Sequence, residues 1–111
     1  MTVFISGGIT DVPDFKVKFK AAEKRLRELG FNVINPAGLQ DNVAVGDFSH
    51  YDYMNICVAL LELSDCAYFL DGWDKSDGSK EEFFYANKIG IPTITQDEER
   101  IVGVQIWEKC N

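Results

Sequence analysis

Cysteine and histidine are scarce in this sequence, and their spacing suggests no metal site. The three cysteines, Cys57, Cys66 and Cys110, are odd in number, widely separated and form no Cys-x-x-Cys pair. We therefore expect neither a disulfide framework nor a zinc site, and we interpret Cys57 and Cys66 as small core residues. The single histidine, His50, has no serine or cysteine partner placed by the sequence, so we expect it to be exposed rather than catalytic.

Long apolar runs and positive charge are also lacking. No stretch approaches the roughly 20 apolar residues of a membrane span, and the N-terminus has no signal-peptide pattern, so we expect a cytoplasmic protein without a membrane partner. Eleven basic residues stand against 18 acidic ones, for a net charge of −7. That balance argues against duplex nucleic acid as a partner. It leaves room for a single nucleotide, because a helix N-terminus can hold one phosphate.

Strand-like and helix-like segments alternate along the chain, which we read as one domain over residues 1–111. β-rich runs occupy residues 2–5, 31–34, 66–70 and 92–95, and helical patterns occupy residues 13–29, 51–63 and 80–89. This alternation predicts a three-layer α/β fold, flavodoxin- or Rossmann-like, with a mostly parallel sheet of four or five strands in the order 2-1-3-4. Residues 96–111 stay unassigned, because they fit an edge strand and a helix start equally well.

Apolar spacing predicts which helix faces are buried. In the first helix the inward stripe consists of Phe15, Phe19, Ala22, Leu26 and Leu29. In the second helix the inward residues are Tyr53, Ile56, Leu60 and Leu63. Residues 37–49 are rich in loop-forming types, and loops of that length are often lids or binding loops.

A polar segment follows the third strand, where open α/β sheets bind small molecules. Residues 71–79 combine an acid, an indole, two glycines and several hydroxyls ahead of a helix, and Glu82 lies in its first turns. The positions four and seven residues after Glu82 are Ala86 and Ile89, which are core types. We therefore expect Glu82 to point inward, and an inward carboxylate is costly unless it has a partner or a task.

Glu82 also has a purely structural interpretation. Ser79 and Glu82 have the spacing of a capping box, in which the glutamate would only hydrogen-bond the helix start. The capping role and a catalytic role compete for the same carboxylate oxygens.

The other candidate residues have similar alternatives. Ser6, Gly7 and Gly8 after the first strand form either a turn or a cradle for phosphate or ribose. Ser76, Gly78 and Ser79 either cap a helix or add an anion site. Trp73 is either a surface or contact aromatic or a ring that stacks on a nucleobase. Asp71 either starts a turn or acts as an acid toward a departing base.

These residues occur in an order that resembles the nucleoside 2-deoxyribosyltransferase-like superfamily, in particular a branch of small bacterial and phage proteins. The resemblance covers about residues 2–95. The matching segments are residues 3–7, 19–26, Gly30, 33–36, 60–61, 64–65 and 72–78, followed by Glu82, Ala86 and Gly90.

The resemblance implies N-glycosidic bond chemistry on a nucleoside or nucleoside monophosphate. At the position of Glu82, members carry a glutamate that attacks the anomeric carbon of the sugar, and water or a second base then resolves the ester. It implies no metal or organic cofactor, and it implies a homo-oligomer. This sequence departs from the pattern at Phe4, where active relatives often have a tyrosine, and at Cys57, where they often have an aspartate. Asp71 is then a candidate replacement acid.

The sequence is therefore compatible with three functions. The first is a nucleotide N-glycosidase or deoxyribosyltransferase-like enzyme acting through Glu82. The second, motivated by Phe4 and Cys57, is a nucleotide-binding module that senses or sequesters its ligand without cleaving it. The third is an interaction domain in an oligomer, in which the consecutive aromatic residues 83–85 and the tail make the contacts.

Overall fold

The structure is a computed structural model that describes residues 1–10, 12–39 and 48–110. Its sheet contains β1 (Thr2–Ser6), β2 (Asn32–Ile34), β3 (Cys66–Phe69) and β4 (Thr93–Thr95). All pairings are parallel and the strand order is β2-β1-β3-β4. The predicted three-layer α/β class and strand order are confirmed.

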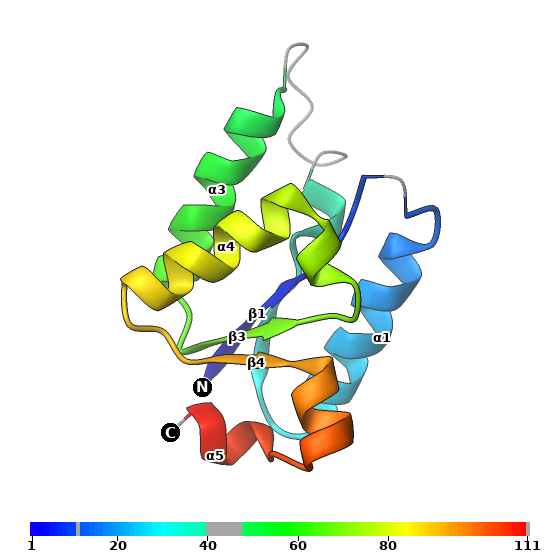
Figure 1. Ribbon diagram of the computed structural model, residues 1–111, viewed down its shortest axis with the longest axis vertical. Coiled ribbons are helices and arrows are strands. Elements are labelled where there is room, and N and C mark those ends of the chain that lie inside the picture. Colours follow the sequence, from blue (N-terminus) through cyan, green and yellow to red (C-terminus); the bar gives the residue numbers. More distant parts are fainter. Residues whose placement is uncertain (11, 40–47, 111) are drawn as a thin grey trace.

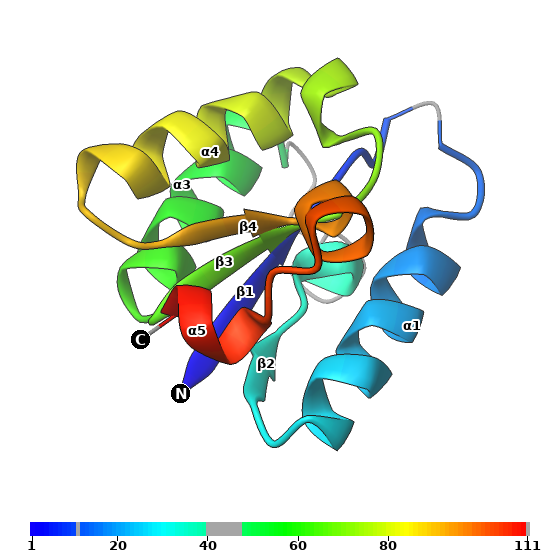
Figure 2. The same cartoon turned by 60° about the horizontal axis from the view of Figure 1, so that its bottom comes forward.

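Helices cover both faces of this sheet. The α-helices are α1 (Phe15–Glu28), α3 (His50–Glu62), α4 (Asp77–Lys88) and α5 (Ile106–Cys110). Shorter helical turns are η1 (Pro36–Gly38), η2 (Trp73–Lys75) and the π-helical η3 (Glu98–Val102). Figure 2 shows α3 and α4 on one face, with α1 and the C-terminal segment on the other. None of the helices in the described part of the chain is long and apolar enough to cross a membrane.

Alternation along β1 decides which face each of its side chains serves. Val3 and Ile5 pack in the core under α1 and α5, whereas Phe4 packs in the core under α3 and α4. Ser6 shares the face of Phe4 because it lies two residues further on. A polar residue thereby reaches the α4 side of the sheet at the carboxyl end of β1.

The chain topology then brings distant loops together. β1 and β3 are neighbours in the sheet although α1, β2 and α3 separate them in sequence. The loop after β1 packs on the end of β3 so closely that a Cβ at Gly7 would lie 3.2 Å from Leu70 Cβ. In Figure 1 the starts of α1, α3 and α4 gather at this end of the sheet. The polar residues after both strands therefore meet at one edge.

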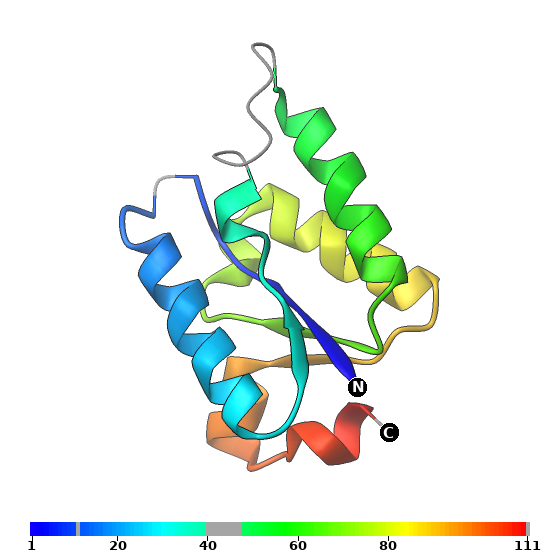
Figure 3. The ribbon, with the colours of Figure 1, turned by 180° about the vertical axis from the view of Figure 1, so that it is seen from behind.

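The C-terminal segment forms helices, so within the described residues the sheet has four strands and no fifth. The helical interpretation of residues 97–99 is correct and the edge-strand alternative is wrong. Ile106 buries its side chain in the α1-side core, and the Trp107 ring stacks on Phe31 at a centroid distance of 4.0 Å. Figure 3 shows that α5 returns close to the start of the chain.

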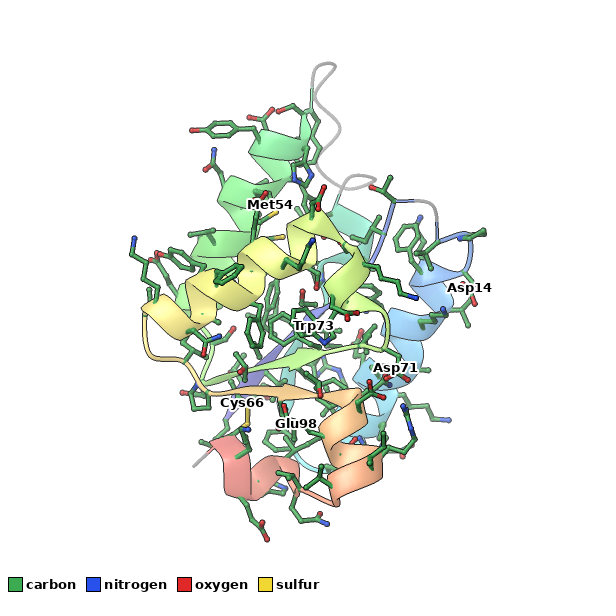
Figure 4. All side chains as sticks on the ribbon, viewed as in Figure 1. Asp14, Met54, Cys66, Asp71, Trp73 and Glu98 are labelled. Carbon is green, nitrogen blue, oxygen red and sulfur yellow. A yellow bond between two sulfur atoms is a disulfide. The ribbon has the colours of Figure 1, made fainter. Side chains whose placement is uncertain are left out.

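The expectation of no disulfide is wrong. Cys66 and Cys110 form a disulfide across 44 residues of sequence, and it is visible near the label of Cys66 in Figure 4. Cysteine-spacing rules recognise short-range motifs, whereas this bond depends on α5 returning beneath the first residue of β3. Cys57 is free and buried, as the core interpretation requires.

The predicted helix positions are close, but two of the predicted inward residues, Leu29 and Leu63, are exposed. In α1, Phe19, Ala22 and Leu26 are buried as expected, while Leu29 lies beyond the helix and is exposed. In α3 the buried residues are Tyr53, Met54, Cys57 and Leu61. Leu63 was predicted to be inward and is instead 73% exposed. Most of the predicted loop at residues 37–49 lies outside the described residues.

Candidate functional site

A cleft of about 460 Å³ opens at the carboxyl ends of β1 and β3. Its walls are the loop after β1, the first turns of α3 and α4, and the end of η2. This is the edge where parallel α/β sheets place their ligands, and its size suits a small molecule. The lining residues are Gly7, Ile9, Thr10, His50, Tyr53, Lys75, Ser76, Asp77, Gly78, Ser79 and Glu82.

Glu82 is the most unusual residue of this cleft, because its side chain is ionisable and yet only 4% exposed. It lies in the second turn of α4, and Ala86, one turn further on, is fully buried. The inward direction predicted for Glu82 is therefore confirmed, although Ile89, the second residue used to predict it, is 39% exposed at the end of the helix. α4 thus holds a carboxyl group on its sheet-facing side where the cleft begins.

Two serines hold one side of this carboxyl group. The Ser6 hydroxyl donates to Glu82 Oε1 at 2.7 Å, and the Ser6 and Ser79 hydroxyl oxygens lie 2.6 Å apart. Because Ser6 gives its only proton to Glu82, the proton between the two serines comes from Ser79. The resulting chain runs from Ser79 through Ser6 to Glu82, and all three side chains are buried. It fixes the orientation of the carboxyl group.

The other carboxyl oxygen is left open. Glu82 Oε2 is buried and has no hydrogen-bond partner among the described residues. A buried polar atom without a partner costs free energy, and native structures contain few of them. Glu82 lines the cleft, so a ligand that enters meets this carboxyl group, beside which the Cys57 thiol favours the charged form.

Burial raises the pKa of Glu82 to about 7, because removal from water disfavours the charged form. The hydrogen bond from Ser6 and the neighbouring Cys57 thiol act in the opposite direction and favour the carboxylate. The group therefore changes its charge near neutral pH. Perturbed carboxyl groups of this kind are concentrated in functional sites.

The capping-box interpretation of Glu82 is wrong. α4 begins at Asp77, earlier than predicted, and its N-cap is Ser76, whose Oγ accepts from the Ser79 N–H at 3.2 Å. Ser79 therefore lies inside the helix and is free to bond Ser6. Because the helix start is satisfied by Ser76, the oxygens of Glu82 are not used for capping.

α3 contributes a phenol and a thiol on the same face. Tyr53 lines the cleft, and Cys57 lies one turn further on, next to Glu82. Burial is the main cause that raises the pKa of both groups, and the nearby Glu82 carboxylate raises it further. Both groups consequently stay protonated at neutral pH. Sequence reasoning assigned Cys57 to the core correctly, but it did not identify Tyr53 as a cleft residue.

His50 is exposed, as predicted, and it also lies at the mouth of the cleft. A Cβ added at Gly78 would lie 3.1 Å from His50 Cε1, so the starts of α3 and α4 approach closely here. Sequence reasoning missed this location of His50. No pattern in the sequence before His50 predicts that the start of α3 lies against the start of α4.

Asp71 is separated from the Glu82 cleft. Its carboxylate accepts from Arg100 Nη1 at 2.8 Å, and this hydrogen bond is the first cause that lowers the pKa of Asp71. A carboxylate held in its charged form is poorly suited to donate a proton. Figure 4 shows Asp71 on the α1 side of β3, where it lines a neighbouring hollow.

Trp73 is also absent from the lining of the cleft. Its ring stacks on Phe83 at 4.6 Å between centroids and lies 5.3 Å from the ring of Phe69. In Figure 4 the labelled Trp73 lies between the sheet and α4. The structure thus gives Trp73 a packing role, and stacking on a nucleobase remains a prediction.

Five of the predicted site residues line the one cleft, namely Gly7, Ser76, Gly78, Ser79 and Glu82. Ser6 lies behind Glu82 and orients it, while Gly8 lines the neighbouring hollow. The residues that sequence reasoning missed are Ile9, Thr10, His50, Tyr53, Lys75 and Asp77. The described part of the chain contains no group of three or more histidine, cysteine, aspartate or glutamate side chains that could hold a metal ion.

Comparison with protein families gives one match. The model of the family described as "Domain of unknown function (DUF4406)" matches residues 1–95, so the chain belongs to this family. The matched range contains the whole sheet and every residue of the cleft, and it excludes η3 and α5. Neither the curated proteins nor the solved structures gave a match.

Proposed function

We propose that this member of the DUF4406 family cleaves the N-glycosidic bond of a nucleoside or nucleoside monophosphate, with Glu82 as the nucleophile. The proposal rests on one observation above all. A nearly fully buried carboxyl group lies at a cleft with one oxygen held by Ser6 and the other without a partner among the described residues. The resemblance to the nucleoside 2-deoxyribosyltransferase-like superfamily supports it independently.

The proposed reaction has two steps. In the first, the Glu82 carboxylate attacks the anomeric carbon, the bond from that carbon to the base nitrogen breaks, and the base leaves with the electron pair and takes up a proton. In the second, water attacks the same carbon and loses one proton to the solvent, the bond between the sugar and Glu82 breaks, and the carboxylate is restored. A second base in place of water would make the reaction a transfer.

The cleft residues have distinct roles in this proposal. Ser6 keeps one carboxylate oxygen in place, so that Oε2 is the attacking atom. Ser76, Gly78 and the free N–H groups at the start of α4 face the phosphate or sugar, since the first N–H groups of a helix lack intrahelical partners. His50 at the mouth is a candidate proton donor to the departing base, in place of Asp71.

Base release tests the proposal. The protein is incubated with nucleosides and nucleoside monophosphates of each common base, in ribose and deoxyribose forms, and free base is measured by chromatography. We expect release with at least one substrate, and we expect Glu82→Gln to reduce it by about 10³-fold or more, the scale seen when a unit of the catalytic machinery is lost. Glu81→Gln, the exposed neighbour on the same helix, is the matched control. Release that is unchanged in Glu82→Gln would overturn the proposal.

A second candidate function is non-catalytic nucleotide binding. It is favoured by Phe4, which is fully buried in the core and offers no hydroxyl to Glu82, and by Cys57, whose thiol holds its proton. Binding by calorimetry with intact nucleotide recovered after long incubation would support this function over the enzymatic one.

A further inference from the structure

A second hollow adjoins the Glu82 cleft. Its volume is about 340 Å³, and it lies between the loop after β1, the side of α1 and the turn after β3. The two hollows share Thr10, Lys75 and Ser76 as lining residues, so they adjoin at these residues, and we call the pair the recess. The remaining residues of the second hollow are Gly8, Val12, Lys18, Phe19, Leu70, Asp71 and Gly72.

Lys75 stands where the two hollows meet, and no carboxylate of the described residues pairs with it. The other lysine in this wall, Lys18, lies 3.7 Å from Asp14 in a pair that is exposed on both sides, so water weakens that pairing. The only acid in the wall, Asp71, is paired with Arg100. The second hollow therefore favours an anion, although the whole chain carries a net charge of −7.

The N-terminus of α4 lies where the two hollows adjoin. Ser76, its N-cap, belongs to both hollows, and the Ser79 N–H is the one that Ser76 satisfies. The N–H groups before Ser79 are those that a helix leaves open to an anion. Independently of this helix end, the unpartnered and buried Oε2 of Glu82 marks the same recess as a place for a ligand.

We propose that the recess binds a nucleotide whose phosphate chain continues beyond the first phosphate, so that the preferred ligand contains a nucleoside 5′-diphosphate. This inference rests on the proposed function, because it takes the sugar to lie against Glu82. The first phosphate then lies at the start of α4 beside Ser76. The next phosphate enters the second hollow and contacts Lys75.

The size of the two hollows agrees with this arrangement. The Glu82 cleft alone lies within the range of small-molecule sites, which is roughly 300–1,000 Å³. A nucleoside monophosphate therefore needs only the first hollow, and the second is available to a further phosphate. In this proposal the phosphate chain runs from one hollow to the other along Thr10 and Ser76, which line both.

Calorimetry on the Glu82→Gln protein tests this inference without any catalysis. Deoxynucleoside, 5′-monophosphate and 5′-diphosphate of the same base are titrated at low ionic strength, for each common base. We expect the diphosphate to bind about tenfold more tightly than the monophosphate, the scale of one charge-assisted contact at a partly exposed site. Adding Lys75→Gln should remove this advantage, because it should weaken diphosphate binding about tenfold more than monophosphate binding. Lys88→Gln, at the far end of α4, is the control for loss of one positive charge.

Equal affinity for the two nucleotides, or an equal effect of Lys75→Gln on both, would overturn the inference. Either result would leave the glycosidase proposal intact, provided that the monophosphate binds and the wild-type protein releases its base. Absence of binding by every nucleotide, together with absence of base release, would remove both proposals.

Discussion

Glu82 carries a conflict that its surroundings resolve only in part. Ser6 satisfies one oxygen, but burial still disfavours the charged form, and the other oxygen has no partner in the described structure. If position 82 served only the stability of the fold, an uncharged residue there would give a more stable protein. We infer that the buried carboxyl group lowers the stability of the protein without ligand, and that a ligand bound at Glu82 offsets this cost.

This conflict predicts a pH-dependent stability. The pKa of Glu82 is about 7 in the folded chain against an ordinary 4.5, so the folded state holds the proton more tightly. Its contribution to the free energy of unfolding is fully present below about pH 4.5 and is lost as the pH rises through about 7, by up to about 3 kcal/mol. Urea unfolding at pH 5 and pH 8 measures it. Glu82→Gln, which does not titrate, should lack this part of the pH dependence.

Other carboxyl groups also titrate between these pH values, so the comparison must be made between variants. Glu81→Gln removes an exposed carboxylate whose charge is the smallest of the causes that act on the pKa of Glu82. This variant should therefore keep most of the wild-type difference between pH 5 and pH 8. If wild type and Glu82→Gln lose stability equally over this range, folding does not raise the pKa of Glu82.

Ser6 predicts a change in the pH profile of base release. Its hydroxyl favours the Glu82 carboxylate, so Ser6→Ala should raise the pKa of Glu82 and move the acidic limb of kcat/KM to higher pH. The rate at pH 7 then falls while the rate at high pH recovers in part. Ser64→Ala is the matched control, because Ser64 is also buried but bonds the Leu60 carbonyl at the end of α3. A Ser6→Ala profile that keeps its acidic limb in place would contradict the role of this serine.

At the scale of elements, the site depends on where α4 begins. The serine that caps this helix is Ser76, so Ser79 lies one turn further in and can bond the end of β1. Sequence reasoning chose the wrong serine, because Ser79 has a glutamate three residues later, at the spacing of a capping box, whereas Ser76 has Ser79 at that position. In the structure α4 begins after Ser76 and packs on Ser6 through Ser79.

The last element, α5, is tied to the sheet by the disulfide between Cys66 and Cys110. Cys110→Ser should therefore lower the free energy of unfolding by about 3–4 kcal/mol, since the bond closes a long loop in the unfolded chain. Urea unfolding without reductant measures the loss. A thiol reductant should lower the wild-type stability to that of the variant and leave the variant unchanged. Equal stability of both proteins without reductant would show that the bond is absent in solution.

Helix faces were predictable where one stripe is apolar and the opposite side is charged. α1 meets this condition, and its buried residues Phe19, Ala22 and Leu26 follow the prediction. α3 has apolar residues on several sides, so Leu63 and Leu61 were equally good candidates for the core, and only Leu61 is buried. The periodicity of such a helix does not select one face.

At the scale of the molecule, the sheet order followed from the alternation of strands and helices, because right-handed crossovers leave few topologies. That order brought residues after β1 and β3 together and so located the cleft. It did not reveal that Asp71 pairs with Arg100 or that Trp73 packs on Phe83, because both contacts depend on side-chain directions. Homo-oligomer formation stays a prediction, for which Phe84, 74% exposed, is the first candidate contact.

Mass spectrometry of the protein during turnover shows directly whether Glu82 is the nucleophile. After rapid mixing with a nucleotide that releases its base, acid quenching should reveal protein heavier by one sugar phosphate, and peptide mapping should find the added mass on Glu82. Glu82→Gln should show no adduct. Base release without an adduct on Glu82, or with the adduct on another residue, would contradict the central claim that this carboxylate is the nucleophile.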